Sequence, residues 1–338
     1  MRGIICERIG RFKMVDDLPE PVPAEGEAII RIRRVGICGT DLHAFKGNQP
    51  FFSYPRILGH ELAAVVERIG DNEAGLREGD QVSVIPYLHC GACIACRSGK
   101  ANCCVEMKVL GVHLDGGMRE RIAVPASHLI RTEGLTLDET AVLEPLAIGA
   151  HAVRRSGLQA GETALVVGAG PIGLAVMAFV KAAGARCIAM DLNEERLAFC
   201  ERWAGADATV SALRQPQARI AELTDGDLPT AVFDATGSAR SMTEAFSFVA
   251  HGGRLVYVGL VKADIAFHDP EFHRRELTLI GSRNATREDF DRVLRTVRGG
   301  SVDVGGYITH RAALDQTIES FEGWLRPESN VIKAMVEL

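Results

Sequence analysis

The sequence predicts an α/β fold of two domains, one built on a doubly wound parallel sheet and the other rich in β-strands. In the second half, apolar strands alternate with helices, beginning with the strand Thr163–Val167, the helix Ile172–Ala183 and the strand Cys187–Asp191. Residues 1–148 instead show short strands separated by loops, such as Ala28–Val35. At 338 residues the chain is also longer than one ordinary hydrophobic core supports.

Each expected element rests on the period of its apolar residues. Ile30 and Ile32 alternate with Arg31 and Arg33, which is the period of a strand with one buried face. Strands that alternate with helices need crossover connections, so the later strands are expected to run parallel with helices on both faces. The other expected elements are the strands Gln81–Ile85, Arg121–Val124, Ala231–Asp234, Arg254–Val258 and Leu277–Ile280, and the helices Glu194–Trp203 and Ser241–Val249.

Composition and charge exclude several classes of protein. The net charge is −6 and basic residues form no block, which argues against nucleic acid or an anionic membrane as a partner. Residues 1–14 hold no apolar core of signal-peptide length, so a cytoplasmic location is expected. The uncharged segment Thr163–Val180 contains Gly168, Gly170 and Pro171, which favour a strand, a turn and a helix over a membrane span.

A G-x-G-x-x-G pattern marks the turn between the first apolar strand and its helix. Gly168 permits the turn, Gly170 lets the backbone approach a pyrophosphate, and Gly173 allows close packing of helix on strand. Pro171 and Ile172 open the helix, whose N-terminus offers N–H groups to an anion. This context predicts a Rossmann-type dinucleotide site, the alternative being a glycine turn without a ligand.

The next strand ends in an acidic residue, Asp191, which lies 18 residues beyond Gly173. A carboxylate there accepts hydrogen bonds from the ribose hydroxyls and repels a 2′-phosphate, so NAD is expected rather than NADP. The alternative is that Asp191 only caps the following helix. The nearby Arg196 weakens the preference for NAD over NADP, because a cation there could bind the 2′-phosphate of NADP. Thr236 and Gly259, in turns after later strands, are further candidates for cofactor contact.

Four cysteines follow the spacing C-x2-C-x2-C-x7-C. Four thiolates within 15 residues predict a closed, structural zinc site, and the alternatives are an iron–sulfur cluster or reactive free thiols. Cys103 adjoins the fourth of them, and neighbouring side chains diverge, so only one of the two is expected to ligate. The predicted ligands are Cys90, Cys93, Cys96 and Cys104.

A second cluster suggests a catalytic zinc site. Cys38 and His60 are ligand types that zinc accepts, and a carboxylate from Glu61 or Glu144 would complete three protein ligands. The fourth position would then remain open to water or substrate. Spacing alone only suggests this zinc site, since a cysteine and a histidine 22 residues apart are more often structural than ligating. The alternative for Glu144 is a helix cap.

These motifs occur in an order that resembles the zinc-containing medium-chain dehydrogenase/reductase family. The shared motifs are Gly-Ile-Cys-Gly-Thr-Asp-x-His at residues 36–43, Gly-His-Glu at 59–61, the four-cysteine loop and the late glycine turn. Glu144-Pro145-Leu146 resembles the polyol and threonine dehydrogenase branch. The resemblance covers essentially the whole chain. It implies a GroES-like catalytic domain at 1–148, a Rossmann NAD-binding domain at 149–284, and a C-terminal segment, 285–338, that completes the catalytic domain.

The resemblance also implies roles for individual residues. Cys38, His60 and one of the two glutamates would hold a catalytic zinc, and the family leaves open which glutamate ligates directly. Asp41 would hydrogen-bond the other nitrogen of His60 and fix its tautomer. Thr40 would take the substrate's proton and His43 would pass it to solvent, the alternatives being an ST-turn and a surface histidine. Two zinc ions per chain and NAD are therefore expected.

The expected function is oxidation of a secondary alcohol of a small polyhydroxy substrate to a ketone. The segment Gly281–Thr286 and residues 54–61 are similar to sugar-acid dehydrogenases of the galactonate and gulonate 5-dehydrogenase type. Arg283 is accordingly a candidate for pairing with a substrate carboxylate, although an interdomain or subunit salt bridge is an alternative. Remaining alternatives are a threonine 3-dehydrogenase, a sorbitol-type dehydrogenase, a zinc-free NADPH quinone or enone reductase, or a non-enzymatic NAD-binding protein. The family implies a homodimer or homotetramer.

Overall fold

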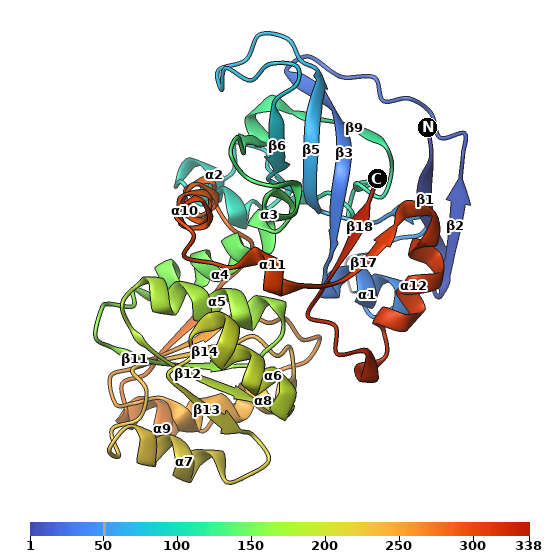
Figure 1. Cartoon of the computed structure of the whole chain (residues 1–338). Helices are drawn as coiled ribbons and strands as arrows, with labels where there is room; N and C mark the ends of the chain where they lie inside the picture. The colour runs from blue at the N-terminus through green and yellow to red at the C-terminus, as the bar shows by residue number, and fades with distance from the viewer. Residues whose placement is uncertain (50–51) are drawn as a thin grey trace. The chain divides into compact units, whose positions relative to one another are not determined.

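The computed structural model describes residues 1–49 and 52–338, in which the chain forms two units. The first unit comprises residues 1–144 and 294–338, and the second comprises residues 145–293 (Figure 1). Two helices run across the division, α4 (Leu143–Ser156) and α10 (Arg287–Arg298).

A mixed seven-stranded sheet forms the frame of the first unit. Its strand order is β10-β6-β5-β3-β18-β17, and β9 also pairs with β3. The long strand β3 therefore joins two strands from the first part of the sequence, β5 and β9, to β18 at its end, as Figure 1 shows. These strands are β3 (Glu27–Ile37), β5 (Glu61–Arg68), β6 (Gln81–Val84), β9 (Arg121–Pro125), β10 (Leu129–Arg131), β17 (Ile308–Ala313) and β18 (Lys333–Glu337).

Shorter elements complete this unit. A three-stranded sheet has the order β2-β1-β4, and β7 pairs with β8. The strands are β1 (Gly3–Arg8), β2 (Arg11–Val15), β4 (Arg56–Ile57), β7 (Tyr87–Leu88) and β8 (Lys108–Val109). The helices are α1 (Gly39–Lys46), α2 (Ile94–Arg97), α3 (Leu137–Ala141), α11 (Val304–Tyr307) and α12 (Thr317–Trp324).

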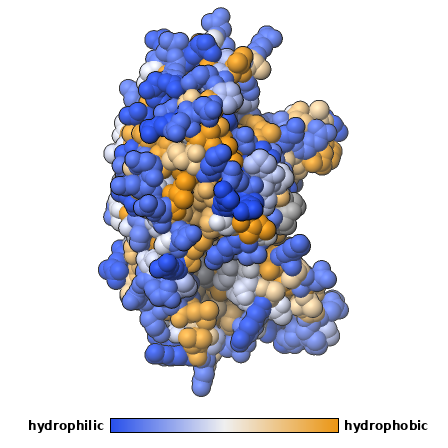
Figure 2. Space-filling model, turned by 90° about the vertical axis from the view of Figure 1, so that its right-hand side faces the viewer, coloured by the Kyte–Doolittle hydropathy of each residue, from blue (hydrophilic) through white to orange (hydrophobic). Residues whose placement is uncertain are grey.

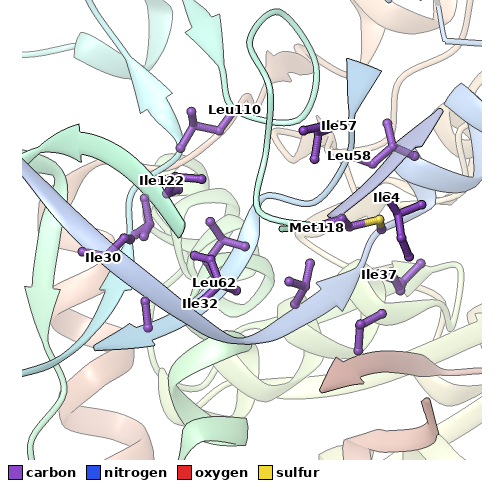
Figure 3. Close-up of a cluster of buried hydrophobic side chains, with 14 of the residues drawn as sticks. Ile4, Ile30, Ile32, Ile37, Ile57, Leu58, Leu62, Leu110, Met118 and Ile122 are labelled. Atoms are coloured by element: carbon purple, nitrogen blue, oxygen red, sulfur yellow. The ribbon is translucent and has the colours of Figure 1, made fainter. Parts of the chain in front are cut away.

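The core of the first unit gathers about β3. Ile30 and Ile32 of β3 are fully buried with Leu62 of β5 and Ile122 of β9, and Figure 3 shows them in one cluster. Burial of one such side chain contributes roughly 1.5–3 kcal/mol. Arg31, between the two isoleucines, is exposed, so the predicted alternation of β3 is confirmed.

The second unit contains a six-stranded parallel sheet of order β13-β12-β11-β14-β15-β16, which confirms the doubly wound fold class. Its strands are β11 (Thr163–Val167), β12 (Arg186–Asp191), β13 (Ala208–Ser211), β14 (Ala231–Asp234), β15 (Arg254–Tyr257) and β16 (Thr278–Gly281). Its helices, besides α4 and α10, are α5 (Pro171–Ala182), α6 (Glu194–Phe199), α7 (Pro216–Leu223), α8 (Ala239–Glu244) and α9 (Asp269–Arg274). The strand β13 and the helices α7, α9 and α10 were not expected from the sequence.

Two expected helices are shorter than their apolar pattern suggested. The helix α6 ends at Phe199 and continues as a π-helical turn, Cys200–Ala204. The helix α8 ends at Glu244 and continues as a 3₁₀ turn, Ala245–Phe248. In both cases the chain keeps turning with altered hydrogen bonding, which an apolar period does not reveal.

The surface is mixed in polarity. Figure 2 shows small apolar patches scattered among hydrophilic residues on the drawn face. Leu260 and Leu279, both in the second unit, are among the exposed large hydrophobic residues. Within the described residues, every helix is too short or too polar to cross a bilayer.

Candidate active site

The glycine turn of the second unit requires glycine at two of its positions, Gly168 and Gly173. Gly168 has a φ of +99°, a conformation that favours glycine. A Cβ on Gly173 would lie 1.7 Å from the carbonyl oxygen of Gly168, so only glycine fits at the start of α5. Gly170 immediately precedes α5 and Pro171 is its first residue, as predicted for an anion-binding helix N-terminus. Ile172 follows in the first turn.

Asp191 stands at the end of β12, beside this turn. Its Oδ2 accepts a hydrogen bond from the N–H of Ala169 at 2.6 Å, and its Oδ1 accepts one from Asn193 at 2.9 Å. The cap of α6 is Asn193, whose side chain accepts the N–H groups of Glu195 and Arg196, so Asp191 is not itself the cap. The Arg196 guanidinium reaches 4.0 Å from the Cβ position of Gly170. A carboxylate and a cation therefore flank the glycine turn.

Two further turns lie at the carboxyl ends of neighbouring parallel strands. Thr236 follows β14, and its hydroxyl donates to Asp234 Oδ1 at 2.8 Å while accepting the N–H of Ser238 at 3.1 Å. Gly259 follows β15, and a Cβ there would lie 2.5 Å from the nitrogen of Gly237. The two turns thus pack together at the sheet edge where β11 ends, which is where ligands bind to such sheets.

Cys90, Cys93, Cys96 and Cys104 converge in the first unit. Their ligand atoms all lie within 4.8 Å of one another, and four of the sulfur–sulfur distances fall between 3.5 and 4.0 Å. A tetrahedral ion with Zn–S bonds near 2.3 Å requires sulfur–sulfur distances of about 3.8 Å. The loop therefore has the geometry of a four-thiolate site.

Backbone N–H groups support three of these sulfurs, those of Cys90, Cys93 and Cys104, as thiolates, whereas burial raises the pKa of Cys96. The amide of Cys93 donates to Cys90 Sγ at 3.4 Å, and the amides of Cys90 and Glu106 donate to Cys104 Sγ at 3.3 Å each. Hydrogen bonds from the backbone of Cys96 and Val105 lower the pKa of Cys93 to about 6. Such donors favour the charged sulfur that binds a metal.

Cys38, His60 and Glu61 form a second cluster. Cys38 directly follows β3, while His60 precedes β5 and Glu61 begins it. Their ligand atoms all lie within 4.8 Å of one another, and His60 and Glu61 are buried. A thiol, an imidazole and a carboxylate are donors that zinc accepts, so these residues fit the expected metal.

Asp41, three residues after Cys38, lies next to His60 and is fully buried. Its carboxylate accepts the backbone N–H groups of Cys38 at 2.9 Å and Gly59 at 3.2 Å. His60 Nδ1 is 3.8 Å from Asp41 Oδ1, which is beyond hydrogen-bond distance. The expected Asp41–His60 hydrogen bond is therefore absent here, because the carboxylate is held by the two loops that carry the ligands. Asp41 interacts with His60 electrostatically, and its two hydrogen bonds join the loop of Cys38 to the loop of Gly59 and His60.

Glu144 lies in the first turn of α4 and is also buried. Tyr87 donates its hydroxyl proton to Glu144 Oε1, while Oε2 is buried without a hydrogen-bond partner among the described residues. Burial raises the pKa of Glu144 to about 7, despite the neighbouring His60. A buried carboxylate oxygen with no partner is unfavourable unless an ion or water reaches it. Besides the Cys38, His60 and Glu61 set, this unpartnered oxygen is a second observation that fits a metal ion at the site.

A buried lysine, Lys333 of β18, lies beside the cluster. Its Nζ contacts Glu61 Oε1 at 2.6 Å and Oε2 at 2.8 Å. Burial alone would lower the pKa of Lys333, but Glu61 and Tyr307 raise it above its ordinary value. Sequence reasoning missed Lys333, although a lysine within the apolar run 331–336 signals a buried charge.

The proposed relay residues lie on the helix that follows Cys38. Thr40 and His43 are three residues apart on α1 and so share one face. Thr40 is half-buried and His43 is exposed. Arg283, the candidate for binding substrate, follows β16 in the second unit.

Comparison with known proteins finds two dehydrogenase families along the chain. Residues 24–134 match the alcohol dehydrogenase GroES-like domain, and residues 171–298 match the zinc-binding dehydrogenase family. The chain is 42% identical over 316 residues to L-galactonate-5-dehydrogenase of Escherichia coli K12, covering 94% of this chain and 93% of that protein. It is 32% identical over 323 residues to L-idonate 5-dehydrogenase of Vitis vinifera, covering 91% and 87% respectively.

A solved structure with the same architecture comes from Escherichia coli CFT073. This protein, described as a short chain alcohol dehydrogenase (rspB) complexed with cofactor NADH, superposes with a TM-score of 0.92 at 27% identity. The match covers 100% of this chain and 99% of that one. With both family domains matched in order, the chain is an oxidoreductase that belongs to the zinc-dependent medium-chain dehydrogenase/reductase family.

Proposed function

We propose that this chain uses zinc and NAD to oxidise a secondary alcohol of a sugar acid to the ketone. The observation that supports this most strongly is the buried convergence of Cys38, His60 and a glutamate in the first unit. A soft thiolate, a borderline imidazole and one carboxylate make a three-ligand set that leaves a position for substrate.

The chain's own residues then have distinct tasks. Cys38, His60 and one of the glutamates, Glu61 or Glu144, would hold the catalytic ion. When bound, zinc would lower the pKa of the substrate hydroxyl and NAD would accept the hydride. Thr40 receives the proton of that hydroxyl, and His43, exposed one helical turn further on, passes it to water.

NAD is the proposed cofactor of the second unit. Asp191 offers a carboxylate at the end of β12, which accepts ribose hydroxyls and repels a 2′-phosphate. Gly168, Gly170, Pro171, Ile172 and Gly173 form the pyrophosphate turn, with Thr236, Gly259 and Arg196 at its margins. The solved relative with bound NADH supports this assignment.

A sugar acid is the proposed substrate because of two relatives. The proteins from Escherichia coli K12 and Vitis vinifera are named for L-galactonate and L-idonate, which are both carboxylates. A planar guanidinium such as that of Arg283 pairs bidentately with a carboxylate. A threonine 3-dehydrogenase is the second candidate, since the chain is also 31% identical to such an enzyme of Bacillus velezensis.

For the domain division we propose a GroES-like domain at 1–148, a Rossmann domain at 149–284, and a C-terminal segment, 285–338, that completes the first. The pairing of β18 with β3 supports a discontinuous first domain. A cytoplasmic location is also proposed, because four converging free thiols suit a reducing compartment.

The proposed assembly is a homodimer or homotetramer in which two copies pair through β16. This strand is the edge of the parallel sheet, and Thr278, Leu279 and Gly281 on it are exposed. A sheet edge with an exposed leucine invites pairing with another strand, and the same edge of a second copy is a self-complementary partner. Light scattering of wild type and of Leu279→Lys tests this, and a monomeric wild type would contradict it.

The experiment that tests the function combines metal analysis with a substrate panel. We expect two zinc ions per chain, and NADH formation with hexonates that exceeds formation with neutral polyols or L-threonine. Cys38→Ser should remove one zinc and lower kcat by about 1,000-fold or more, since a Lewis acid contributes several kcal/mol. Full turnover of metal-stripped protein would refute the zinc mechanism, whereas activity on threonine alone would refute only the substrate.

A further inference from the structure

Asp234, the last residue of β14, is a fully buried carboxylate in the second unit. Its Oδ1 accepts the N–H and the hydroxyl of Thr236 at 3.0 and 2.8 Å, and its Oδ2 accepts the hydroxyl of Ser241 at 2.6 Å. Burial of a carboxylate is unfavourable unless its charge is compensated, and these three donors are neutral. Packing alone therefore does not account for an aspartate at this place.

The backbone of Asp234 holds the turn of the neighbouring strand. Its carbonyl oxygen accepts the N–H groups of Val258 and Gly259 at 2.9 Å each. Gly259 also packs against the turn after β14, since a Cβ on it would lie 2.5 Å from the nitrogen of Gly237. Asp234 thus fixes the turn after β14 through its side chain and the turn after β15 through its carbonyl group.

The side chain of Thr236 is committed to this arrangement. Its hydroxyl has one proton, which it donates to Asp234, and the same oxygen accepts the N–H of Ser238 at 3.1 Å. A Cβ on Gly168 would lie 3.0 Å from Thr236 Cγ2, so this turn also lies against the glycine turn after β11. The hydroxyl has no second proton for a cofactor, and the turn would contact one through its backbone.

The place of Asp234 in the sheet indicates which part of the cofactor these turns would contact. The strand β11 has β12 and β13 on one side and β14, β15 and β16 on the other. A dinucleotide lies across the point where the strand order reverses, with one nucleotide on each half of the sheet. Asp191, proposed to bind the adenosine ribose, ends β12. The nicotinamide nucleotide would therefore lie over the ends of β14 and β15.

We propose that Asp234 is a positioning residue for the nicotinamide half of the cofactor site. It holds the turns that follow β14 and β15 without contacting the cofactor itself. This inference rests on the proposed function. Hydride transfer needs the nicotinamide ring in one orientation, so rigid turns on this side affect the rate as well as the binding. The adenosine half of the site, over β12 and β13, does not depend on Asp234.

The first test compares the binding of NADH with that of ADP, which lacks the nicotinamide nucleoside. Asp234→Ala should raise the Kd for NADH about 10-fold, because the hydrogen bonds that hold the turn are lost, and leave the Kd for ADP within about twofold. Isothermal titration calorimetry measures both. Equal weakening of the two ligands, or unchanged NADH binding, would overturn the proposal. A wild-type chain that binds neither ligand would instead defeat the proposed NAD site.

The second test uses kinetics and the conservative variant. In Asp234→Ala, kcat should fall about 100-fold, since misplacement of a reacting group by about 1 Å has such an effect, while the KM for the alcohol changes less. Asp234→Asn keeps an oxygen for Thr236, and its NH₂ group can donate to the Ser241 oxygen. It should therefore restore both NADH binding and kcat to within about threefold of wild type. Failure of Asp234→Asn to restore them would refute the role of these hydrogen bonds.

Asp207 provides a matched control at the opposite end of the same parallel strands. It directly precedes β13, and its carboxylate accepts the N–H of Cys187, near the start of β12, at 2.7 Å and lies 2.7 Å from Lys181 Nζ. Asp207→Ala should lower Tm without changing the Kd of NADH or of ADP. A loss of NADH binding in this variant as large as in Asp234→Ala would show that general destabilisation explains both, and would overturn the proposal.

Thr236→Val covers the case in which Asp234→Ala does not fold. It keeps the shape of the side chain and removes only the hydroxyl that joins the turn to Asp234. The Kd for NADH should rise about 3- to 5-fold, as expected for one hydrogen bond, while the Kd for ADP stays unchanged. Unchanged binding of both ligands, or equal weakening of both, would overturn the proposal.

Discussion

Asp191 Oδ2 accepts a hydrogen bond from the backbone N–H of Ala169 at 2.6 Å, which ties the end of β12 to the glycine turn. The same carboxylate is the group proposed to accept the cofactor's ribose. Asp191 therefore holds the turn that would bind the pyrophosphate, and the same carboxylate would favour a ribose without a 2′-phosphate.

Asp191→Ser should weaken NAD and favour NADP. We expect the KM for NAD to rise about 10-fold, since a hydrogen bond to a charged group contributes about 1.5–3 kcal/mol. The KM for NADP should fall, because Arg196 is then free to pair with the 2′-phosphate. Steady-state kinetics with both cofactors measure this. Adding Arg196→Ala should abolish the gain in affinity for NADP. If Asp191→Ser instead raises the KM for both cofactors equally, Asp191 only stabilises the glycine turn and does not select the cofactor.

His43→Asn should lower kcat by about 100-fold at neutral pH without changing the metal content. The proton would then have no group to carry it from Thr40 to water. Added imidazole buffer should restore part of the rate, which a structural histidine would not allow. His310→Asn, on β17, is the matched control and should turn over normally. Failure of imidazole to restore any rate would count against the relay.

Cys104→Ser should remove the structural metal and destabilise the first unit. Cys104 is buried and its sulfur lies 3.5 Å from Cys90 Sγ, so the loop loses a ligand that holds it closed. Because metal binding contributes to folding, we expect several kcal/mol lower stability. Thermal unfolding and zinc analysis measure both effects. The neighbouring Cys103 is exposed, so Cys103→Ser should keep two zinc ions and an unchanged Tm.

Glu162 should make the stability of the second unit fall in acid. Burial alone would raise the pKa of Glu162, but hydrogen bonds from Arg254, Gln159 and Thr230 lower it to about 2 from an ordinary 4.5. The stabilisation is therefore complete above pH 4.5 and is lost as the pH falls towards 2.

Glu162→Gln should accordingly cost roughly 2 kcal/mol at pH 7 and nothing near pH 2. Urea unfolding of both proteins across this range measures the difference. A difference that does not depend on pH would show that the carboxylate's charge has no part in it.

Arg283→Ala should raise the KM for aldonates at least 10-fold while leaving neutral polyols within about twofold. The reason is that a guanidinium gains energy only from a charged partner. Arg283→Lys should recover little, since lysine lacks the planar fork. Equal effects on both substrate classes would instead indicate a structural salt bridge.

The sequence predicted those parts of the fold that have a local signal. The alternation about Ile30 and Ile32 and the glycines of the turn after β11 are patterns within a few residues. The strand β13 was missed because its four residues, Ala208–Ser211, include only one fully buried side chain, Val210. A strand so short and so partly covered lacks the apolar period that prediction needs.

The candidate site was predictable only as a set of residue types. Cys38 and His60 could be chosen by their chemistry, but which glutamate is free to bind a metal depends on partners far along the chain. Lys333 lies 272 residues from Glu61, and no spacing rule connects them. The tertiary fold alone brings them together.

The position of β18 bears on how the protein is made. This strand pairs with β3 and β17 in the sheet of the first unit, yet the ribosome synthesises it after the whole of the second unit. While the nascent chain emerges, Glu61 therefore lacks its lysine partner, and residues 34–37 of β3 lack the strand that pairs with them in the folded sheet. All residues of the second unit are therefore synthesised before the strand that completes the sheet of the first unit, so the ion pair of Glu61 with Lys333 forms only after translation has passed residue 333.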